Sequence, residues 1–530
     1  MRLRAILGSV TALALSAGAA AADYKITILH TNDFHSRLEP VSKYDSGCSA
    51  EDNAEGKCFG GSARLITAID KARSERENTI LVDGGDQFQG SLFYTYYKGK
   101  AAAEMMTALG YEAMTVGNHE FDDGPEVLAG FMAAVGFPVL MSNADVSAEP
   151  SLAGKLMPST IIEKAGEKIG LIGLTPEDTD ELSSPGKTIV FEDPAAAVAR
   201  EVAKLEAAGV NKIIVLSHSG YGVDQDVAKT VAGVDVIVGG HTNTYLSNTS
   251  DRAAGPYPTM VTGPDGGHTA IVSAYAYGKY LGHLDVVFDD AGKIVTAVGE
   301  PIVMDGSVEE NPQIKGRIEQ MAEPLEQIRN KVVAQTGEVI GGDRAVCRAE
   351  ACEMGVLVAD AMLARVKSQG IDIAITNGGG LRASIDAGEI TMGEVLTVLP
   401  FQNTLSTFQL TGAGVIAALE NGVSQIEEGA GRFPQVAGIK FSFDPNMEAG
   451  SRIVEVMVQD GDAWAPIDEA KVYGVVSNNY MRGGGDGYKI FATDGMNAYD
   501  FGPALDEVVA AYLVEHQPYT PYVDDRISRK

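Results

Sequence analysis

The sequence predicts two α/β domains joined by a helix. A length of 530 residues exceeds what one hydrophobic core usually organises, so two domains are expected. In the first half, short β-branched apolar runs end in polar, glycine-marked turns and alternate with helix-like stretches, which is typical of a layered α/β domain with buried strands. From Gln335 onward the pattern changes to a second, mixed α+β unit.

The expected elements follow the apolar runs along the chain. In the first unit we expect strands at 26–29, 79–82, 114–116, 168–174, 213–216 and 234–238, and helices at 101–109, 125–135 and 194–208. In the second unit we expect strands at 371–375, 408–410, 439–443, 453–458 and 472–476. Apolar residues recur at helical spacing from Ile314 to Val332, and Pro324 should kink this helix. The predicted domains are 23–306 and 334–530, with a linker helix over 307–333.

The N-terminus has the features of a secretory signal peptide. Arg2 and Arg4 precede an apolar run over 5–15, and alanines at 20–22 end the segment. We expect residues 1–22 to be removed and the protein to be periplasmic or secreted, because no later run suits a membrane helix and no anchor signal follows. Loss of both arginines takes the formal charge from −31 to −33, which disfavours nucleic acid polymers as partners.

Four cysteines form two close pairs in the sequence. Cys48 lies near Cys58, and Cys347 lies near Cys352. In an exported chain this pattern favours two local disulfides. Zinc binding by the four is the alternative, but neither spacing is C-x-x-C and no histidine is adjacent.

Side chains that can bind metal follow five of the expected strands in the first unit. Layered α/β folds place ligand sites at the carboxyl edge of their strands, so these residues should converge there. A single aspartate, asparagine or histidine in such a turn is more often a cap or an ordinary hydrogen-bonded side chain, but five independent cases are hard to attribute to chance. The candidate ligands are Asp33, His35, Asp86, Asn118, His218 and His241.

The residue types suit a pair of divalent cations. In extended backbone, Asp33 and His35 point to the same side and can hold one ion. Asp86 has two oxygens and can bridge two cations, while Asn118 and the imidazoles add ligands without excess charge. Two such cations lower the pKa of a bound water and clamp the oxygens of a phosphoryl displacement. His119 and Asp122 are spaced so that the carboxylate could orient the imidazole toward phosphate oxygens, although a helix cap by Asp122 is the alternative.

These residues resemble the motifs of calcineurin-like two-metal phosphoesterases and, more closely, of the 5'-nucleotidases. The resemblance covers essentially the whole mature chain. It implies a layered metallophosphoesterase domain, a mixed α+β substrate domain and two divalent metal ions, with zinc preferred over manganese, cobalt or magnesium. It also implies hydrolysis of nucleoside 5'-monophosphates to nucleoside and phosphate by a metal-activated water. The supporting motifs are Asp33-Phe34-His35, Gly85-Asp86, Gly117-Asn118-His119-Glu120, His218, Gly240-His241, and the segments 35–40, 85–90 and 274–282.

The resemblance also implies roles for particular residues. The six candidate ligands would hold the metals, with Asn243 as an additional candidate, and His119 with Asp122 would form a catalytic dyad. The implied substrate contacts are Arg348 and Arg382 for phosphate, Asn377 and Gly380 in the substrate loop, Phe401 and Tyr480 for stacking on the base, and Asp486 for the ribose hydroxyls. Without the resemblance these substrate residues would be weak candidates, since a lone phenylalanine is usually core and glycine-rich turns are usually only turns. A hinge rotation should bring the substrate to the metals.

The sequence departs from the 5'-nucleotidase pattern at Tyr480 and Arg482, and three alternative functions remain open. Tyr480 stands where phenylalanine is usual in the animal 5'-nucleotidases. Stacking on the base should therefore be retained, while the preferred base could change. Arg482 adds a cation near the ribose loop and could favour substrates with further phosphates or a sugar. The first alternative is a pyrophosphatase acting on NAD or UDP-sugars. The others are a periplasmic nucleotide-binding protein without turnover and an inactive adhesin. No oligomeric state is predicted.

Overall fold

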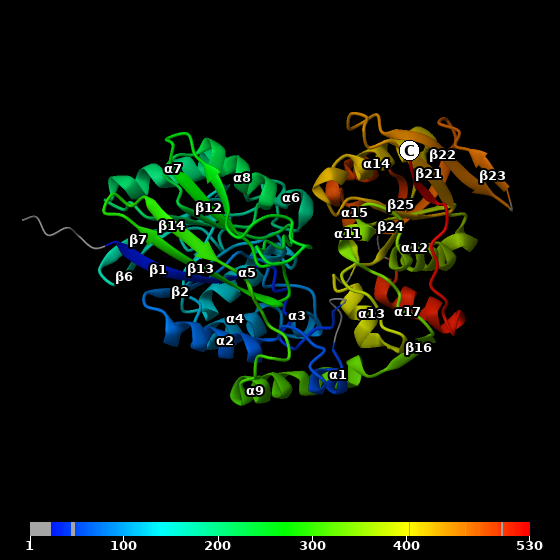
Figure 1. Ribbon diagram of the computed structural model, residues 1–530. Helices are drawn as coiled ribbons and strands as arrows, with labels where there is room; N and C mark the ends of the chain where they lie inside the picture. Colours follow the sequence, from blue (N-terminus) through cyan, green and yellow to red (C-terminus); the bar gives the residue numbers. More distant parts are fainter. Residues whose placement is uncertain (1–22, 44–47, 402, 462, 500–501) are drawn as a thin grey trace, which may run out of the picture.

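The computed structural model describes residues 23–43, 48–401, 403–461, 463–499 and 502–530, so the expected signal peptide lies outside the described residues. The chain forms two lobes (Figure 1). The first lobe comprises the blue to green part of the chain, and the second comprises the yellow to red part. The segment that contains α9 runs beneath both lobes and connects them.

Two mixed sheets packed face to face form the centre of the first lobe. Their inner faces share one apolar core, to which Ile28, Val82, Leu171 and Val238 contribute fully buried side chains. The first sheet has the order β14 (Ile294–Gly299), β13 (Tyr280–Phe288), β1 (Tyr24–Thr31), β2 (Thr79–Asp83), β3 (Ala113–Thr115) and β4 (Val139–Leu140), with β15 (Ile302–Val303) also on β13. The second has the order β11 (Thr259–Thr262), β12 (His268–Val272), β10 (Val236–Gly239), β9 (Ile213–Ser217), β7 (Glu167–Leu174) and β6 (Ser159–Lys164).

Helices cover the outer face of each sheet. α2 (Ser62–Glu75), α4 (Gly99–Leu109) and α5 (Pro125–Ala134) pack on the first sheet, whereas α7 (Pro194–Ala207) and α8 (Tyr221–Thr230) pack on the second. Strands β1 to β4 run parallel, as do β7, β9, β10 and β12. The carboxyl ends of these strands therefore meet along one edge of the lobe, as the sequence predicts.

The linker helix is shorter than the sequence predicts. α9 spans Pro312–Ala322 and is capped by Asn311, whose side chain accepts from two backbone N–H groups. A 3₁₀ turn at Glu323–Leu325 and a single turn, α10 (Glu326–Arg329), follow. Val332 already begins strand β16 (Val332–Thr336). The apolar spacing continues into this strand, so the spacing alone overestimates the helix, and Pro324 lies where α9 ends.

The second lobe contains a five-stranded and a four-stranded sheet. The first has the order β20 (Pro434–Ala437), β17 (Ile373–Asn377), β24 (Val472–Asn478), β19 (Leu405–Thr411) and β25 (Met496–Tyr499). The second has the order β23 (Ala463–Pro466), β22 (Ile453–Asp460), β21 (Ile439–Phe443) and β26 (Ile527–Arg529), while β16 pairs with β18 (Gly388–Thr391). The packing helices are α12 (Glu353–Val366), α13 (Met392–Val398), α14 (Gly412–Val423), α16 (Lys489–Thr493) and α17 (Leu505–Glu515).

Both expected disulfides are present. Cys48 is bonded to Cys58, and Cys347 to Cys352. The second bridge spans the short helix α11 (Arg344–Cys347) and the start of α12, so it restrains the loop that carries Arg348. Among the helices of the described ranges, none combines the length and the apolarity that crossing a membrane requires.

Candidate active site

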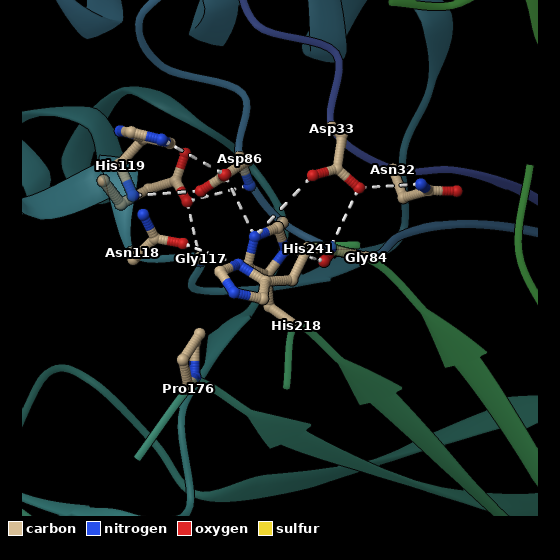
Figure 2. Close-up of polar contacts among 12 residues, drawn as sticks. Asn32, Asp33, Gly84, Asp86, Gly117, Asn118, His119, Pro176, His218 and His241 are labelled. Atoms are coloured by element: carbon tan, nitrogen blue, oxygen red, sulfur yellow. Dashed lines mark hydrogen bonds and ion pairs between the residues drawn. The ribbon is translucent and has the colours of Figure 1, made fainter. Parts of the chain in front are cut away.

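The strand-end residues of the first lobe converge on one point. Asp33 follows β1, Asp86 follows β2, and His218 follows β9, so the two sheets both contribute. Ligand atoms of these three residues all lie within 4.8 Å of one another, and the side chains are buried (Figure 2). Asn118, after β3, and His241, after β10, lie beside them. The sequence-predicted cluster is therefore assembled from five strands.

The distances within the cluster are those of donor atoms that face a common centre. His218 Nε2 lies 3.0 Å from Asp86 Oδ2 and 3.9 Å from Asp33 Oδ1. His35 Nε2 lies 3.8 Å from Asp86 Oδ2 and 4.0 Å from Asp33 Oδ1. On the other side, His241 Nδ1 lies 3.0 Å from Asn118 Oδ1. Asp86 is thus adjacent to both His35 and His218, the position that a bridging carboxylate requires.

The ring nitrogens are arranged as metal ligands usually are. His218 Nδ1 lies 2.6 Å from the carbonyl oxygen of Gly84, and His35 Nδ1 lies 3.2 Å from that of Phe88. A carbonyl partner fixes the proton on Nδ1 and leaves the Nε2 lone pair for a cation. His218 Nε2 is buried and makes no hydrogen bond despite its proximity to Asp86. This orphaned nitrogen among carboxylate oxygens fits a divalent cation.

The electrostatics of the cluster favour bound positive charge. Burial raises the pKa of Asp33, and the neighbouring Asp86 charge raises it further, whereas His218 opposes both. Burial alone would lower the pKa of His218, but the charges of Asp86 and Asp33 raise it to about 10. Burial lowers the pKa of His35 and His241 well below the usual value, which keeps these imidazoles neutral and able to bind a metal.

Backbone geometry at the cluster differs from the sequence-based expectation. The sequence predicts extended backbone for Asp33 and His35, but both have positive φ values, 50° and 51°. Asp86 and His241 do too, at 59° and 72°. Such conformations cost of order 1 kcal/mol or more each for residues other than glycine and concentrate at functional sites. Gly117 allows the close approach of these loops, since a Cβ there would lie 2.2 Å from Asp86 Oδ1.

His119 and Asp122 are in contact, and a third residue binds the same carboxylate. His119 Nδ1 lies 2.8 Å from Asp122 Oδ2. The other carboxylate oxygen of Asp122 accepts a 2.8 Å hydrogen bond from Ser183 Oγ. Ser183 follows α6 (Thr179–Leu182), which packs against the 3₁₀ turn Gly485–Gly487 of the second lobe. The sequence offers no signal for Ser183, because it lies 61 residues from Asp122.

Glu120 supports the cluster from behind. Its Oε2 accepts from the N–H groups of Asp86 at 3.0 Å and Gly117 at 2.6 Å, and its Oε1 accepts from Gln87 at 2.8 Å and Phe88 at 3.1 Å. The side chain is fully buried. One carboxylate therefore satisfies four backbone donors of the two loops that carry Asp86 and Asn118. Glu120 belongs to one of the motifs noted in the sequence, but the sequence alone indicates no role for it.

Residues of the second lobe face this cluster directly. Arg382 Nη2 lies 3.1 Å from His35 Nε2, and the guanidinium is 5.6 Å from the centre of the Phe401 ring. The Phe401 ring centre is in turn 5.4 Å from that of His119. The two lobes therefore lie so that Arg382 and Phe401 of the second lobe adjoin the candidate metal ligands of the first.

Two further arginines, Arg348 and the unpredicted Arg344, add positive charge near Arg382. Arg348 donates to the carbonyl of Gly429 at 3.2 Å, and burial together with the charges of Arg344 and Arg382 lowers its pKa. Arg344 donates to Tyr277 Oη at 3.0 Å. In the orientation that satisfies its amide, Asn243 donates to Asp33 at 3.0 Å and accepts from Arg344. Positions 344 and 348 are four residues apart and would lie on the same side of a helix, so this spacing is the sequence feature that could have indicated Arg344.

The turn Gly485–Gly487, which carries Asp486, lies at the carboxyl ends of β17 and β24. Asn377 Nδ2 donates to Asp486 Oδ2 at 2.6 Å, and Tyr480 Oη donates to Asp486 Oδ1 at 3.1 Å. Gly380 ends the turn that follows Asn377. Arg482 Nη1 donates to the carbonyl of Phe491, and its guanidinium lies 5.5 Å from the ring centre of buried Phe408. Two of its contacts therefore lie on the side of these packed aromatics.

Comparison with known protein families agrees with the geometry of the site. Residues 26–245 match the family model described as calcineurin-like phosphoesterase. The fold of the first lobe is therefore that of a calcineurin-like phosphoesterase. Residues 332–493 match the family model described as 5'-nucleotidase, C-terminal domain.

Relatives that match over almost the whole chain identify the family more closely. The chain is 39% identical to the 5'-nucleotidase of Rattus norvegicus over 528 residues, which cover 96% of this chain and 91% of that protein. A solved 5'-nucleotidase precursor from Thermus thermophilus is 40% identical with a TM-score of 0.91, covering 96% of this chain and 99% of that one. The NAD nucleotidase of Haemophilus influenzae is 27% identical with a TM-score of 0.59, covering 96% and 100%. The chain therefore belongs to the 5'-nucleotidase family.

This membership confirms the expected fold class and the expected enzyme class, phosphoric monoester hydrolase. It also disfavours the two non-enzymatic alternatives, a binding protein without turnover and an adhesin.

Proposed function

We propose that the protein is an exported, metal-dependent 5'-nucleotidase that hydrolyses nucleoside 5'-monophosphates to nucleoside and phosphate. One observation carries the proposal: the buried group of Asp33, Asp86 and His218 lies beside Arg382 of the second lobe, through the 3.1 Å contact of that arginine with His35. Cation-binding donors and a phosphate-binding guanidinium therefore adjoin in one place. The domain boundaries that we propose are 23–306 and 334–530, with the linker over 307–333.

Asp33, His35, Asp86, Asn118, His218 and His241 would hold two divalent cations. The donor set of imidazole, carboxylate and amide groups favours zinc, with manganese, cobalt or magnesium as alternatives. When bound, the cations would supply Lewis acidity and lower the pKa of a water near the phosphate. Asp33 and Asp86 would contribute the negative charge that retains them, and Glu120 would keep the loop of Asp86 in place.

The remaining residues would bind and orient the substrate. Arg348 and Arg382, together with Arg344, would hold the phosphate oxygens, since guanidinium groups match such oxygens in pairs. Asp122 would fix the ring of His119, whose Nε2 would then face the reacting phosphate as a hydrogen-bond donor. Phe401 and Tyr480 would stack on the base, with Asn377, Gly380 and Asp486 forming the sugar side of the pocket.

A second candidate function is cleavage of diphosphate bonds, as in NAD or UDP-sugars. Three neighbouring arginines, the buried Arg382 and the half-buried Arg344 and Arg348, provide more positive charge than a single phosphate needs beside two cations. The likeness to a protein named NAD nucleotidase also favours it. Both activities could use the same site.

A substrate and metal panel tests the proposal. The mature protein is assayed for phosphate or nucleotide release from AMP, ADP, NAD and UDP-glucose, after loading with zinc, manganese, magnesium or cobalt. We expect the highest kcat/KM for AMP, loss of turnover on chelation and recovery on adding metal. Turnover that survives complete chelation would exclude the metal mechanism, and greater kcat/KM for NAD would favour the second candidate. Export is tested by N-terminal sequencing of protein from cell fractions, with a new N-terminus near Asp23 expected.

A further inference from the structure

The Tyr480 hydroxyl makes two hydrogen bonds to one residue. It donates to Asp486 Oδ1 at 3.1 Å and accepts from the backbone N–H of Asp486 at 3.1 Å. Tyr480 lies in the single-turn helix α15 (Asn479–Arg482), which directly follows β24. A hydroxyl can donate once and accept twice, so one hydroxyl can make both bonds at the same time. Phenylalanine at this position could make neither bond.

Asp486 needs this support because its backbone is in an unfavourable conformation. Its φ and ψ are 53° and 30°, the left-handed region, within the 3₁₀ turn Gly485–Gly487. Asn421 Nδ2 also donates to the carbonyl of Asp486 at 3.0 Å. The Tyr480 ring packs on Gly485, where a Cβ would lie 2.4 Å from ring carbons. The Tyr480 ring and hydroxyl therefore hold the turn from one side, and Asn421 holds it through the hydrogen bond to the Asp486 carbonyl.

The carboxylate of Asp486 is only partly used by these contacts. A carboxylate has about four lone-pair sites. Asn377 Nδ2 occupies one on Oδ2 at 2.6 Å, and Tyr480 Oη occupies one on Oδ1. About two sites remain, one for each oxygen, and the side chain is 5% exposed. Two vicinal hydroxyl groups are the donors that such a fixed pair of sites would accept.

The Tyr480 hydroxyl stays a donor over the working pH range. Burial raises the pKa of Tyr480 well above its usual value, and the charge of Asp486 raises it further. The hydrogen bond to the carboxylate therefore does not depend on pH near neutrality.

Resting on the proposed function, we infer that Tyr480 is a positioning residue for Asp486, and that its hydroxyl sets the selectivity of the enzyme for ribonucleotides over 2'-deoxyribonucleotides. Tyr480 acts through the carboxylate, whose orientation it fixes before substrate arrives. A hydroxyl lost from the sugar then leaves one oriented lone-pair site of Asp486 without a donor, which costs more than it would at a mobile carboxylate.

Tyr480→Phe tests the inference, because it keeps the ring and removes only the hydroxyl. Kinetics are measured with AMP, 2'-deoxyAMP and 2',3'-dideoxyAMP on the metal-loaded enzyme. We expect KM for AMP to rise by on the order of 10-fold, the scale of one hydrogen bond to a charged group, with a much smaller change in kcat. The AMP to 2'-deoxyAMP ratio of kcat/KM should fall by several-fold, whereas 2',3'-dideoxyAMP, which has neither hydroxyl, should change least.

Tyr473→Phe is the matched control. Tyr473 lies on the preceding strand β24, is 3% exposed, and its hydroxyl accepts from the backbone N–H of Asp468 at 3.0 Å. Tyr473→Phe should leave the AMP to 2'-deoxyAMP ratio of kcat/KM unchanged. It therefore controls for the general cost of removing a buried hydroxyl. Thermal unfolding of both variants verifies that they are folded.

A double-mutant cycle with Asp486→Ala gives the decisive comparison. If Tyr480 acts through Asp486, Tyr480→Phe has no further effect on the substrate ratio in the Asp486→Ala background. An equal loss on all three substrates, or an unchanged ratio in an enzyme that hydrolyses AMP, would overturn the inference and leave the proposed function intact. A wild-type protein that hydrolyses none of the monophosphates would instead contradict the proposed function.

Discussion

Replacing Glu120 by glutamine tests whether its carboxylate holds the loops of the metal-ligand cluster in place, because the substitution alters none of the proposed ligands. The Glu120 carboxylate accepts four backbone N–H groups, those of Asp86, Gln87, Phe88 and Gly117. Glutamine has nearly the same shape but only one acceptor oxygen. Its amide nitrogen would face two of the four N–H groups, donor against donor, in a site from which water is excluded.

The size of the effect follows from those two orphaned donors. A buried donor that loses its partner costs about 1 to 3 kcal/mol, so the substitution should cost about 2 to 6 kcal/mol of stability. At roughly 2 °C per kcal/mol for a domain of this size, the melting temperature should fall by at least about 4 °C. Because the N–H of Asp86 is among the four, metal affinity should fall as well.

Thermal unfolding and metal content of the purified Glu120→Gln protein check this expectation. Glu126→Gln provides the control, since Glu126 is exposed in the first turn of α5 and the substitution makes the same chemical change on the surface. It should shift the melting temperature by less than about 1 °C. If Glu120→Gln unfolds at the wild-type temperature and retains its metal, the carboxylate does not hold the two loops and the reasoning is refuted.

Three further substitutions address the proposed roles. Asp86→Asn should abolish turnover and lower metal content measured by mass spectrometry, because the bridging position loses its charge; full metal content would contradict this. Arg382→Ala should raise KM for AMP by about 10-fold or more, on the order of one charge-assisted contact, and an unchanged KM would show that the phosphate site is elsewhere. Ser183→Ala should lower kcat for AMP by about 3- to 10-fold with little change in KM, because Asp122 loses one of its two hydrogen-bond partners. Ser183→Thr should restore most of this activity, and equal rates in all three proteins would exclude a role for Ser183.

Most of the strands and the convergence of the ligand cluster were predictable from local pattern. Apolar runs such as those at β1, β2 and β9 are short, and each is followed by a ligand-type residue. The parallel arrangement then brings Asp86 and His218 to one edge, although they lie far apart in sequence. The extent of the linker helix was not predictable in this way, since residues near Val332 fit either a helix or a strand.

Contacts that depend on tertiary structure were not predictable. Nothing near Asp122 indicates that Ser183 binds its carboxylate, and nothing near Glu120 indicates that it accepts from residues about 33 positions away. The left-handed backbone of Asp33 and His35 also has no sequence signature, because hydrogen bonds from their N–H groups to the carbonyls of Gly85 and Asp86 impose it. Such positions are over-determined by their surroundings rather than by local preference.

Anomalous diffraction from crystals of the metal-loaded protein tests the central claim most directly. We expect two anomalous peaks about 3.5 to 4 Å apart, with Asp86 between them and His218 and His241 among their ligands. One peak elsewhere in the molecule, or none after loading with zinc, manganese or cobalt in turn, would contradict this expectation.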